Sequence, residues 1–280
     1  MSKGAGSRIL WCGFVATALW AVALGINVRI FHGRSHLLLL RPFAFGAGLI
    51  GANVVTVVLA LRIRGDYAPG SRMRSAWMLI AAAAGCGIVY YLSLKPGAPG
   101  TRAGPLSLAG QAANALFLLL LVAGLLAMRS AFADLGLGRL RRPDWLLMSA
   151  IVAATGLLTA VRAIAPSPFP SPVVIQLQRL DPLILAICGI TGVCLLRMSS
   201  DLQGGAFAVS LRYGGVFGLL RLAALLVRIS ALSAVPWILF PFTAASFASD
   251  WLLTLLVYHR WRLTPQASEL EKQYSRIEGL

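Results

Sequence analysis

Long apolar stretches alternate with short polar segments through most of the 280 residues. A helix needs about 20 residues to cross a hydrocarbon core roughly 30 Å thick. No water satisfies the backbone within lipid, so each such stretch predicts a helix. We place eight spans at Ile9–Val28, Phe43–Leu61, Ala76–Leu94, Leu108–Met128, Trp145–Ile164, Ile175–Leu196, Gly214–Ser233 and Pro236–Tyr258. The strand-like alternation that is typical of a lipid-facing barrel is not found in the sequence.

The pattern predicts an all-α, polytopic membrane bundle of about eight transmembrane helices over residues 1–262. A short cytoplasmic amphipathic tail follows at 263–280. The sixth span is the least regular, because Arg179 and Asp181 fall in its first third. Seven spans is therefore an alternative. The linkers between the spans are short and leave no room for a soluble domain of any size.

The composition agrees with a membrane protein and changes how the charge is interpreted. Hydrophobic residues make up 58% of the chain and charged residues 12%, whereas soluble domains are nearer half and a quarter. The formal net charge is +16, which in a soluble protein would suggest nucleic acid. Here the arginines stand at the predicted helix ends, which favours anchoring beside anionic lipid headgroups. We expect the lipid bilayer as the surroundings and no nucleic acid as a partner.

The basic residues also indicate an orientation, because they favour cytoplasmic loops. With both termini inside, the inner segments hold 16 of the 25 lysines and arginines, the outer segments hold 8, and Arg221 lies within a span. This bias predicts that both termini are cytoplasmic, although the first outer loop weakens it with three arginines. Arginine outnumbers lysine by 22 to 3, which hints at a GC-rich genome. We expect a multi-pass protein of the cell membrane, with the bacterial inner membrane as the best match.

The main candidate site is a pair of charges, Arg221 and Asp250, within the last two spans. Counted from the turn near Ala234 and Val235, the two residues lie at similar depth, roughly 20 Å down an antiparallel hairpin. A charge near the bilayer centre is by default a functional-site hypothesis, and an ion pair is the natural arrangement for it. We favour a structural pair that pins the hairpin over a place in a substrate or proton path. Close packing of the seventh span is expected from its GxxxG motif.

A second cluster of charges lies toward the predicted outer side. It consists of Arg162, Arg179, Asp181 and Arg228. Its positive excess suits an anionic ligand or a lipid headgroup, whereas snorkelling is the preferred explanation for Arg162 and Arg228. Because Pro182 follows Asp181, we expect a non-helical entry into the sixth span, with Arg179 and Asp181 as a local pair. The proline-rich segment 165–172 would be a stiff, extended cover over this region.

Other residue types give little evidence for chemistry. His32 and His36 are four residues apart, but Gly33 and the lack of an acidic neighbour argue against a metal pair. The four cysteines form no CxxC motif. We therefore predict no catalytic set, no metal and no cofactor. Several mid-span polar residues could line a path, although hydrogen bonds between helices are the commoner reason for them; they are Asn53, Asn114, Thr155 and Thr191.

The tail is the remaining clue. Ala267, Leu270, Tyr274 and Ile277 recur at alternating spacings of three and four, which is an a/d seam over two heptads. Two heptads are short for a coiled coil. We interpret Leu270, Tyr274 and Ile277 as a contact for a membrane-complex subunit or for a second copy of the chain. A short solvated helix is the alternative.

Three function classes stay open. The first is a non-catalytic membrane module, such as a sensor-like, scaffold or accessory subunit, and it agrees best with short loops and absent motifs. The second is a carrier of a small anionic or amphipathic molecule, with Arg221 and Asp250 in its path. The third is an intramembrane enzyme acting on a lipid or isoprenoid, for which Asp250 is the only strong acid or base.

Overall fold

The structure is a computed structural model, and it describes residues 5–30, 48–93, 108–133, 138–164, 172–202, 206–229, 244–245 and 248–263. Within these ranges the regular structure is helical, with no strand. The labelled helices are α1 (Ala5–Ile30), α2 (Gly48–Gly65), α3 (Arg72–Ser93), α4 (Leu108–Ala133), α5 (Arg142–Ile164), α6 (Pro172–Asp201) and α7 (Ala206–Ile229). A last helical stretch covers 248–263, and we call it the C-terminal helix.

The predicted helical membrane bundle is confirmed. In the described part of the chain, seven helices are long and apolar enough to cross a membrane, and they correspond to the first seven predicted spans. The eighth predicted span, Pro236–Tyr258, lies only partly within the described residues, which contain its second half as the C-terminal helix. The division into a bundle and a tail stays a prediction, because residues 264–280 lie outside the described ranges.

The sixth span corrects one expectation. α6 is one continuous helix from Pro172, so the non-helical entry predicted around Arg179 and Asp181 was wrong. Pro182 lies inside this helix, as transmembrane helices tolerate when neighbouring groups satisfy the freed carbonyl. The stretch Pro182–Asp201 has a mean hydropathy of 1.9 over 20 residues and can cross a membrane by itself. The charged residues therefore extend the helix beyond its apolar part, while the choice between eight spans and seven stays a prediction.

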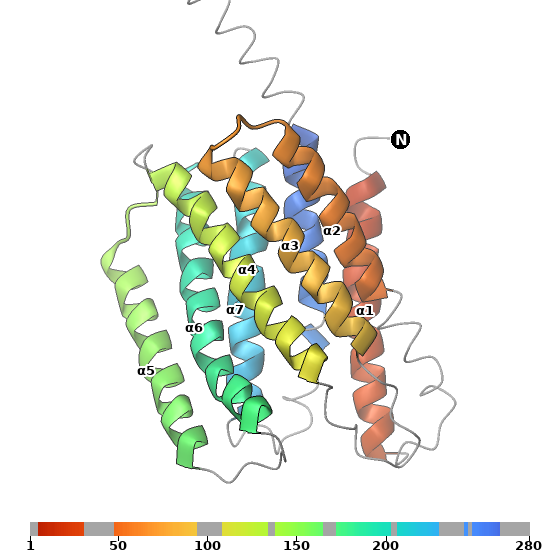
Figure 1. Ribbon diagram of the computed structural model, residues 1–280, viewed down its shortest axis with the longest axis vertical. Coiled ribbons are helices and arrows are strands. Elements are labelled where there is room, and N and C mark those ends of the chain that lie inside the picture. Colours follow the sequence, from red (N-terminus) through yellow and green to blue (C-terminus); the bar gives the residue numbers. More distant parts are fainter. Residues whose placement is uncertain are drawn as a thin grey trace, which may run out of the picture.

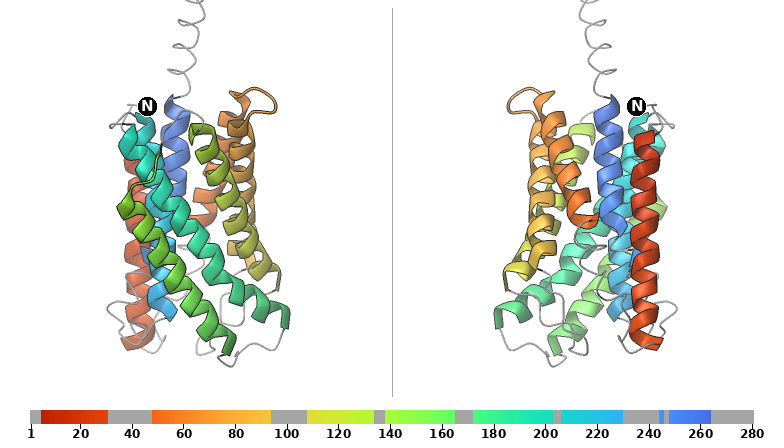
Figure 2. Two further views of the ribbon diagram at one scale, coloured as in Figure 1. Left: turned by 90° about the vertical axis from the view of Figure 1, so that its left-hand side faces the viewer. Right: turned by 90° about the vertical axis from the view of Figure 1, so that its right-hand side faces the viewer.

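The helices run alternately up and down the bundle (Figure 1). The start of α1, the α2–α3 connection and the end of the C-terminal helix lie at the same end of the molecule. α3 packs between α2 and α4, while α6 contacts α4, α5 and α7. α5 stands at one side of the bundle, and the two side views show α1 at the opposite side (Figure 2).

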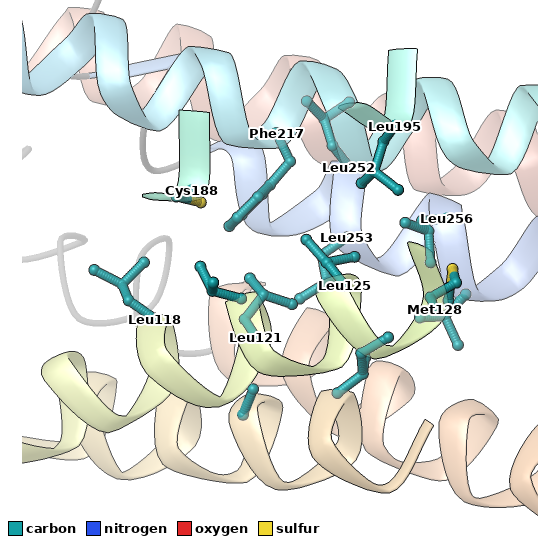
Figure 3. Packing of buried hydrophobic residues seen from close by; sticks show 14 of the residues in the cluster. Leu118, Leu121, Leu125, Met128, Cys188, Leu195, Phe217, Leu252, Leu253 and Leu256 are labelled. Carbon is teal, nitrogen blue, oxygen red and sulfur yellow. The ribbon is translucent and has the colours of Figure 1, made fainter. Parts of the chain in front are cut away.

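The core is formed mainly by α2, α3, α4, α6, α7 and the C-terminal helix. Figure 3 shows leucines of α4 and of the C-terminal helix around Phe217 of α7. Residues 252–257 of the C-terminal helix are all buried. This helix contacts α1 through Trp251, whose ring Nε1 donates to Thr17 at 2.9 Å. The segment that carries Asp250 is therefore enclosed by other helices.

Candidate functional site

Arg221 of α7 and Asp250 of the C-terminal helix form an ion pair between Nη2 and Oδ1. The Asp250 side chain is 1% exposed and that of Arg221 is 12% exposed. The structure thus brings together the two charges that the sequence places at equal depth. Two ions withdrawn from water are stable only when their remaining polar atoms are also satisfied.

The second oxygen of Asp250 is held by two further helices. Tyr91 of α3 donates its hydroxyl to Oδ2 at 2.8 Å. Asn53 of α2 donates Nδ2 to the same oxygen at 3.1 Å. The carboxylate therefore accepts from α2, α3 and α7 together. Hydrogen bonds to an ionised acceptor are stronger than those between neutral groups, so this arrangement ties three helices to a fourth.

Local packing fixes the orientation of Asn53. Its Nδ2 also donates to the carbonyl of Leu49 at 2.9 Å, one turn earlier in α2. Gly87 of α3 faces it so closely that an added Cβ would lie 2.7 Å from Asn53 Oδ1. A larger residue at Gly87 would push the amide away from Asp250. The glycine is therefore part of the support of the site.

A polar seam continues from Asp250 along the C-terminal helix. Thr254 and Thr56 are joined by a hydrogen bond of 3.0 Å between their hydroxyl oxygens. The Thr254 hydroxyl is also 3.1 Å from the carbonyl of Ala52. Both threonines are buried. α2 and the C-terminal helix are thus joined by polar contacts over more than one turn, as is common between helices in lipid.

Arg221 lies beside two aromatic rings that also contact each other edge to face, with centroids 6.5 Å apart. Its Cζ is 5.8 Å from the ring centroid of Phe117 and 5.4 Å from that of Phe217. Both distances fall within the range of cation–π attraction. Its Nε is buried and has no hydrogen-bond partner among the described residues. The guanidinium is therefore stabilised by the neighbouring rings and through Nη2, while its Nε donor has no partner among the described residues.

Glycines allow α7 to approach α6 beside this arginine. A Cβ added at Gly218 would lie 2.5 Å from the carbonyl oxygen of Cys188, and one at Gly192 would lie 2.8 Å from that of Gly215. Gly214 instead faces the Leu256 side chain of the C-terminal helix, at 2.7 Å for an added Cβ. The GxxxG motif thus packs against both α6 and the C-terminal helix.

For the other predicted site residues on helices, the structure gives the helix but not the side chain. Arg162 belongs to α5, Arg179 and Asp181 to α6, and Arg228 to α7. Their side chains lie outside the described part of the structure, so an outer anion site stays a prediction. The tail residues Leu270, Tyr274 and Ile277 also lie outside the described ranges, as do His32, His36 and the proline-rich segment up to residue 171.

The sequence interpretation missed Tyr91 as a partner of Asp250. It noted Asn53 as a mid-span polar residue but did not connect it to the pair. Tyr91 is the second of two adjacent tyrosines near the end of α3. Tyrosines near helix ends commonly mark the membrane interface, so its position alone gave no signal for a buried partner.

No metal site is evident where the structure can be inspected. The described residues contain no group of three or more histidine, cysteine or acidic side chains. The four cysteines are free thiols. The chemistry that the described site offers is therefore charge and hydrogen bonding from Asp250, Arg221, Tyr91 and Asn53.

The fold and the buried network define a helical bundle protein with membrane-spanning helices, held together around a carboxylate. Comparisons with protein-family models, with curated proteins and with solved structures found no match for this chain.

Proposed function

We propose that this protein is a non-catalytic membrane subunit, acting as a sensor-like, scaffold or accessory component of a membrane complex. The observation that supports this proposal best is the Asp250 carboxylate, which is 1% exposed and accepts from Arg221, Tyr91 and Asn53. A general base must reach the proton that it removes. A carboxylate occupied by three protein donors is suited to holding helices in place.

The proposed contact with a partner is the tail. Its seam of Leu270, Tyr274 and Ile277 is too short to pair alone, but the bundle would hold two tails close together and raise their effective concentration. The partner is a second copy of the chain or another membrane subunit. We propose that both termini are cytoplasmic, from the distribution of the basic residues. A bacterial inner membrane is proposed from the excess of arginine over lysine, 22 to 3.

The tail is tested by crosslinking in membranes. In a background in which the four native cysteines are replaced, Leu270→Cys or Ile277→Cys should crosslink to itself or to a co-purifying subunit. Lys272→Cys, on the opposite side of such a helix, is the matched control. Equal crosslinking at position 272 would make the tail a solvated helix and remove the proposed contact.

The orientation is tested with reporter fusions. Fusions after Leu106 and at the C-terminus should report opposite sides of the membrane, with the C-terminus inside. Reporters on the same side would contradict the eight-span arrangement.

A second candidate, a carrier of a small anionic molecule, is favoured by one observation. Arg221 keeps a buried Nε donor that no described residue uses, and an anion could accept from it. The double variant Arg221→Leu with Asp250→Leu separates the two proposals. A subunit should fold and still restore the phenotype of a deletion strain, whereas a carrier should fold and lose that rescue.

A further inference from the structure

A group of exposed arginines stands where the chain passes from α4 into α5. Arg139 and Arg141 lie in the linker and Arg142 is the first residue of α5, and all three are exposed. Trp145 follows in the first turn and is 57% exposed. We call these four residues the α4–α5 corner.

Among the described residues, two aspartates lie near this corner, and both are already engaged. Asp201 Oδ1 is 2.9 Å from Arg197 Nη2, and its Oδ2 accepts from the backbone N–H of Gly138 at 2.9 Å. Asp144 Oδ2 accepts from the backbone N–H of Arg141 at 2.8 Å and is 4.0 Å from Arg197 Nε. Together with Arg197 of α6, four arginines stand against these two aspartates, so the described residues of this region keep an excess of two positive charges.

The linker backbone is fixed against α6. Gly138 has a φ of 77°, a conformation that favours glycine, and an added Cβ there would lie 2.5 Å from Met198 Cγ. The carbonyl of Arg139 accepts from Arg197 Nε at 3.3 Å. The exposed guanidiniums thus extend from a backbone that is held at both Gly138 and Arg139. A held backbone reduces the ordering required when a ligand binds.

Below the corner, α5 offers a long apolar surface. Leu146 is 72% exposed, Val152 56% and Leu157 67%. Only 11% of the apolar stretch of this helix, Arg142–Val161, is buried. α5 stands at the side of the bundle (Figure 1). Tryptophan is enriched at the level of lipid headgroups, so Trp145 marks the boundary between the arginines and the apolar surface.

We propose that the α4–α5 corner binds an anionic phospholipid of the adjoining leaflet. The guanidiniums of Arg139, Arg141 and Arg142 contact the phosphate and the anionic headgroup. Trp145 lies at the glycerol level, and the acyl chains follow the exposed side of α5. Positive charge at headgroup depth above an apolar helix is complementary to such a lipid along its whole length.

The proposal is tested by native mass spectrometry of the full chain titrated with phosphatidylglycerol or with phosphatidylcholine of the same acyl chains. The wild-type protein should retain phosphatidylglycerol preferentially. Arg141→Gln with Arg142→Gln should weaken that binding by about fivefold for each arginine removed. Binding of phosphatidylcholine should not change, since the apolar surface is intact.

The matched control is Arg62→Gln with Arg64→Gln, which removes the same charge at the end of α2. An equal loss of phosphatidylglycerol in this control would reduce the corner to general surface charge and overturn the proposal. Displacement of the lipid by millimolar inorganic phosphate would show a free-anion site instead. Should the double variant not fold, Arg139→Gln in the exposed linker gives the same test with one charge.

Discussion

α7 and α5 are helices of similar length that both pack on α6, yet one is enclosed and the other is exposed. The apolar stretch of α7, Phe207–Ala224, has a mean hydropathy of 1.2, and 50% of it is buried. The apolar stretch of α5, Arg142–Val161, has a mean hydropathy of 1.7, and 11% of it is buried. The more apolar helix is therefore the more exposed one. In lipid, apolar surface gives no drive to associate, because the acyl chains are as apolar as leucine.

The difference between the two helices lies in small and polar residues. α7 has Gly214, Gly215 and Gly218, which admit neighbouring atoms that a Cβ would displace, and it carries Arg221. α5 has Gly156, where an added Cβ would meet nothing within 4 Å. Close backbone approach and a shared buried charge thus enclose α7, and both are lacking in the described contacts of α5.

The largest effect is expected from breaking the buried charge pair that α7 makes with the C-terminal helix. Asp250→Ala should lower the free energy of unfolding by about 3–5 kcal/mol, because it leaves the Arg221 charge buried without its partner. Arg221→Ala should act similarly by isolating Asp250. Unfolding in mixed micelles with increasing sodium dodecyl sulfate measures the change.

Replacing both residues with leucine should recover much of that loss, since no isolated charge then remains. An Asp250→Ala protein that unfolds at the same detergent fraction as the wild type would show that the pair does not enclose α7.

A smaller effect is expected from filling the glycine contact. Gly218→Ala should lower the free energy of unfolding by about 1–3 kcal/mol, because the new methyl group meets the backbone carbonyl of Cys188 and α6 must shift. Gly156→Ala on α5 is the matched control and should change stability by no more than about 0.5 kcal/mol. Equal effects at the two glycines would remove the contrast between the helices.

The smallest effect is expected from a substitution on the exposed side of α5. Leu157→Ala should leave the free energy of unfolding within about 0.5 kcal/mol of the wild-type value. The side chain is 67% exposed, so it loses lipid contacts rather than protein contacts. The same detergent titration measures it. A loss above about 2 kcal/mol in native membranes would reveal a protein partner on this face.

The sequence predicted the helices well, because a run of about 20 apolar residues has few alternatives in lipid. It also predicted that Arg221 and Asp250 meet, since counting from one turn compares their depths. Tyr91 and Asn53 could not be added, because depth does not say which way a helix faces. The packing of α2 against α3, with Gly87 against Asn53, turns these polar groups toward Asp250.

The same reasoning failed at Arg179 and Asp181, where two charges before a proline suggested a break in the helix. The apolar stretch after Pro182 is long enough to cross by itself. The charged turn before it could therefore stay helical without lying at the membrane centre.

The ion pair also bears on how the chain enters the membrane. Arg221 is synthesised 29 residues before Asp250, and an arginine within a single apolar helix opposes insertion, by up to about 2.5–3.5 kcal/mol at the centre. α7 by itself is thus a poor substrate for lateral release from the insertion channel. Once the C-terminal helix emerges, its carboxylate neutralises the arginine, so the two segments should leave the channel together as a hairpin.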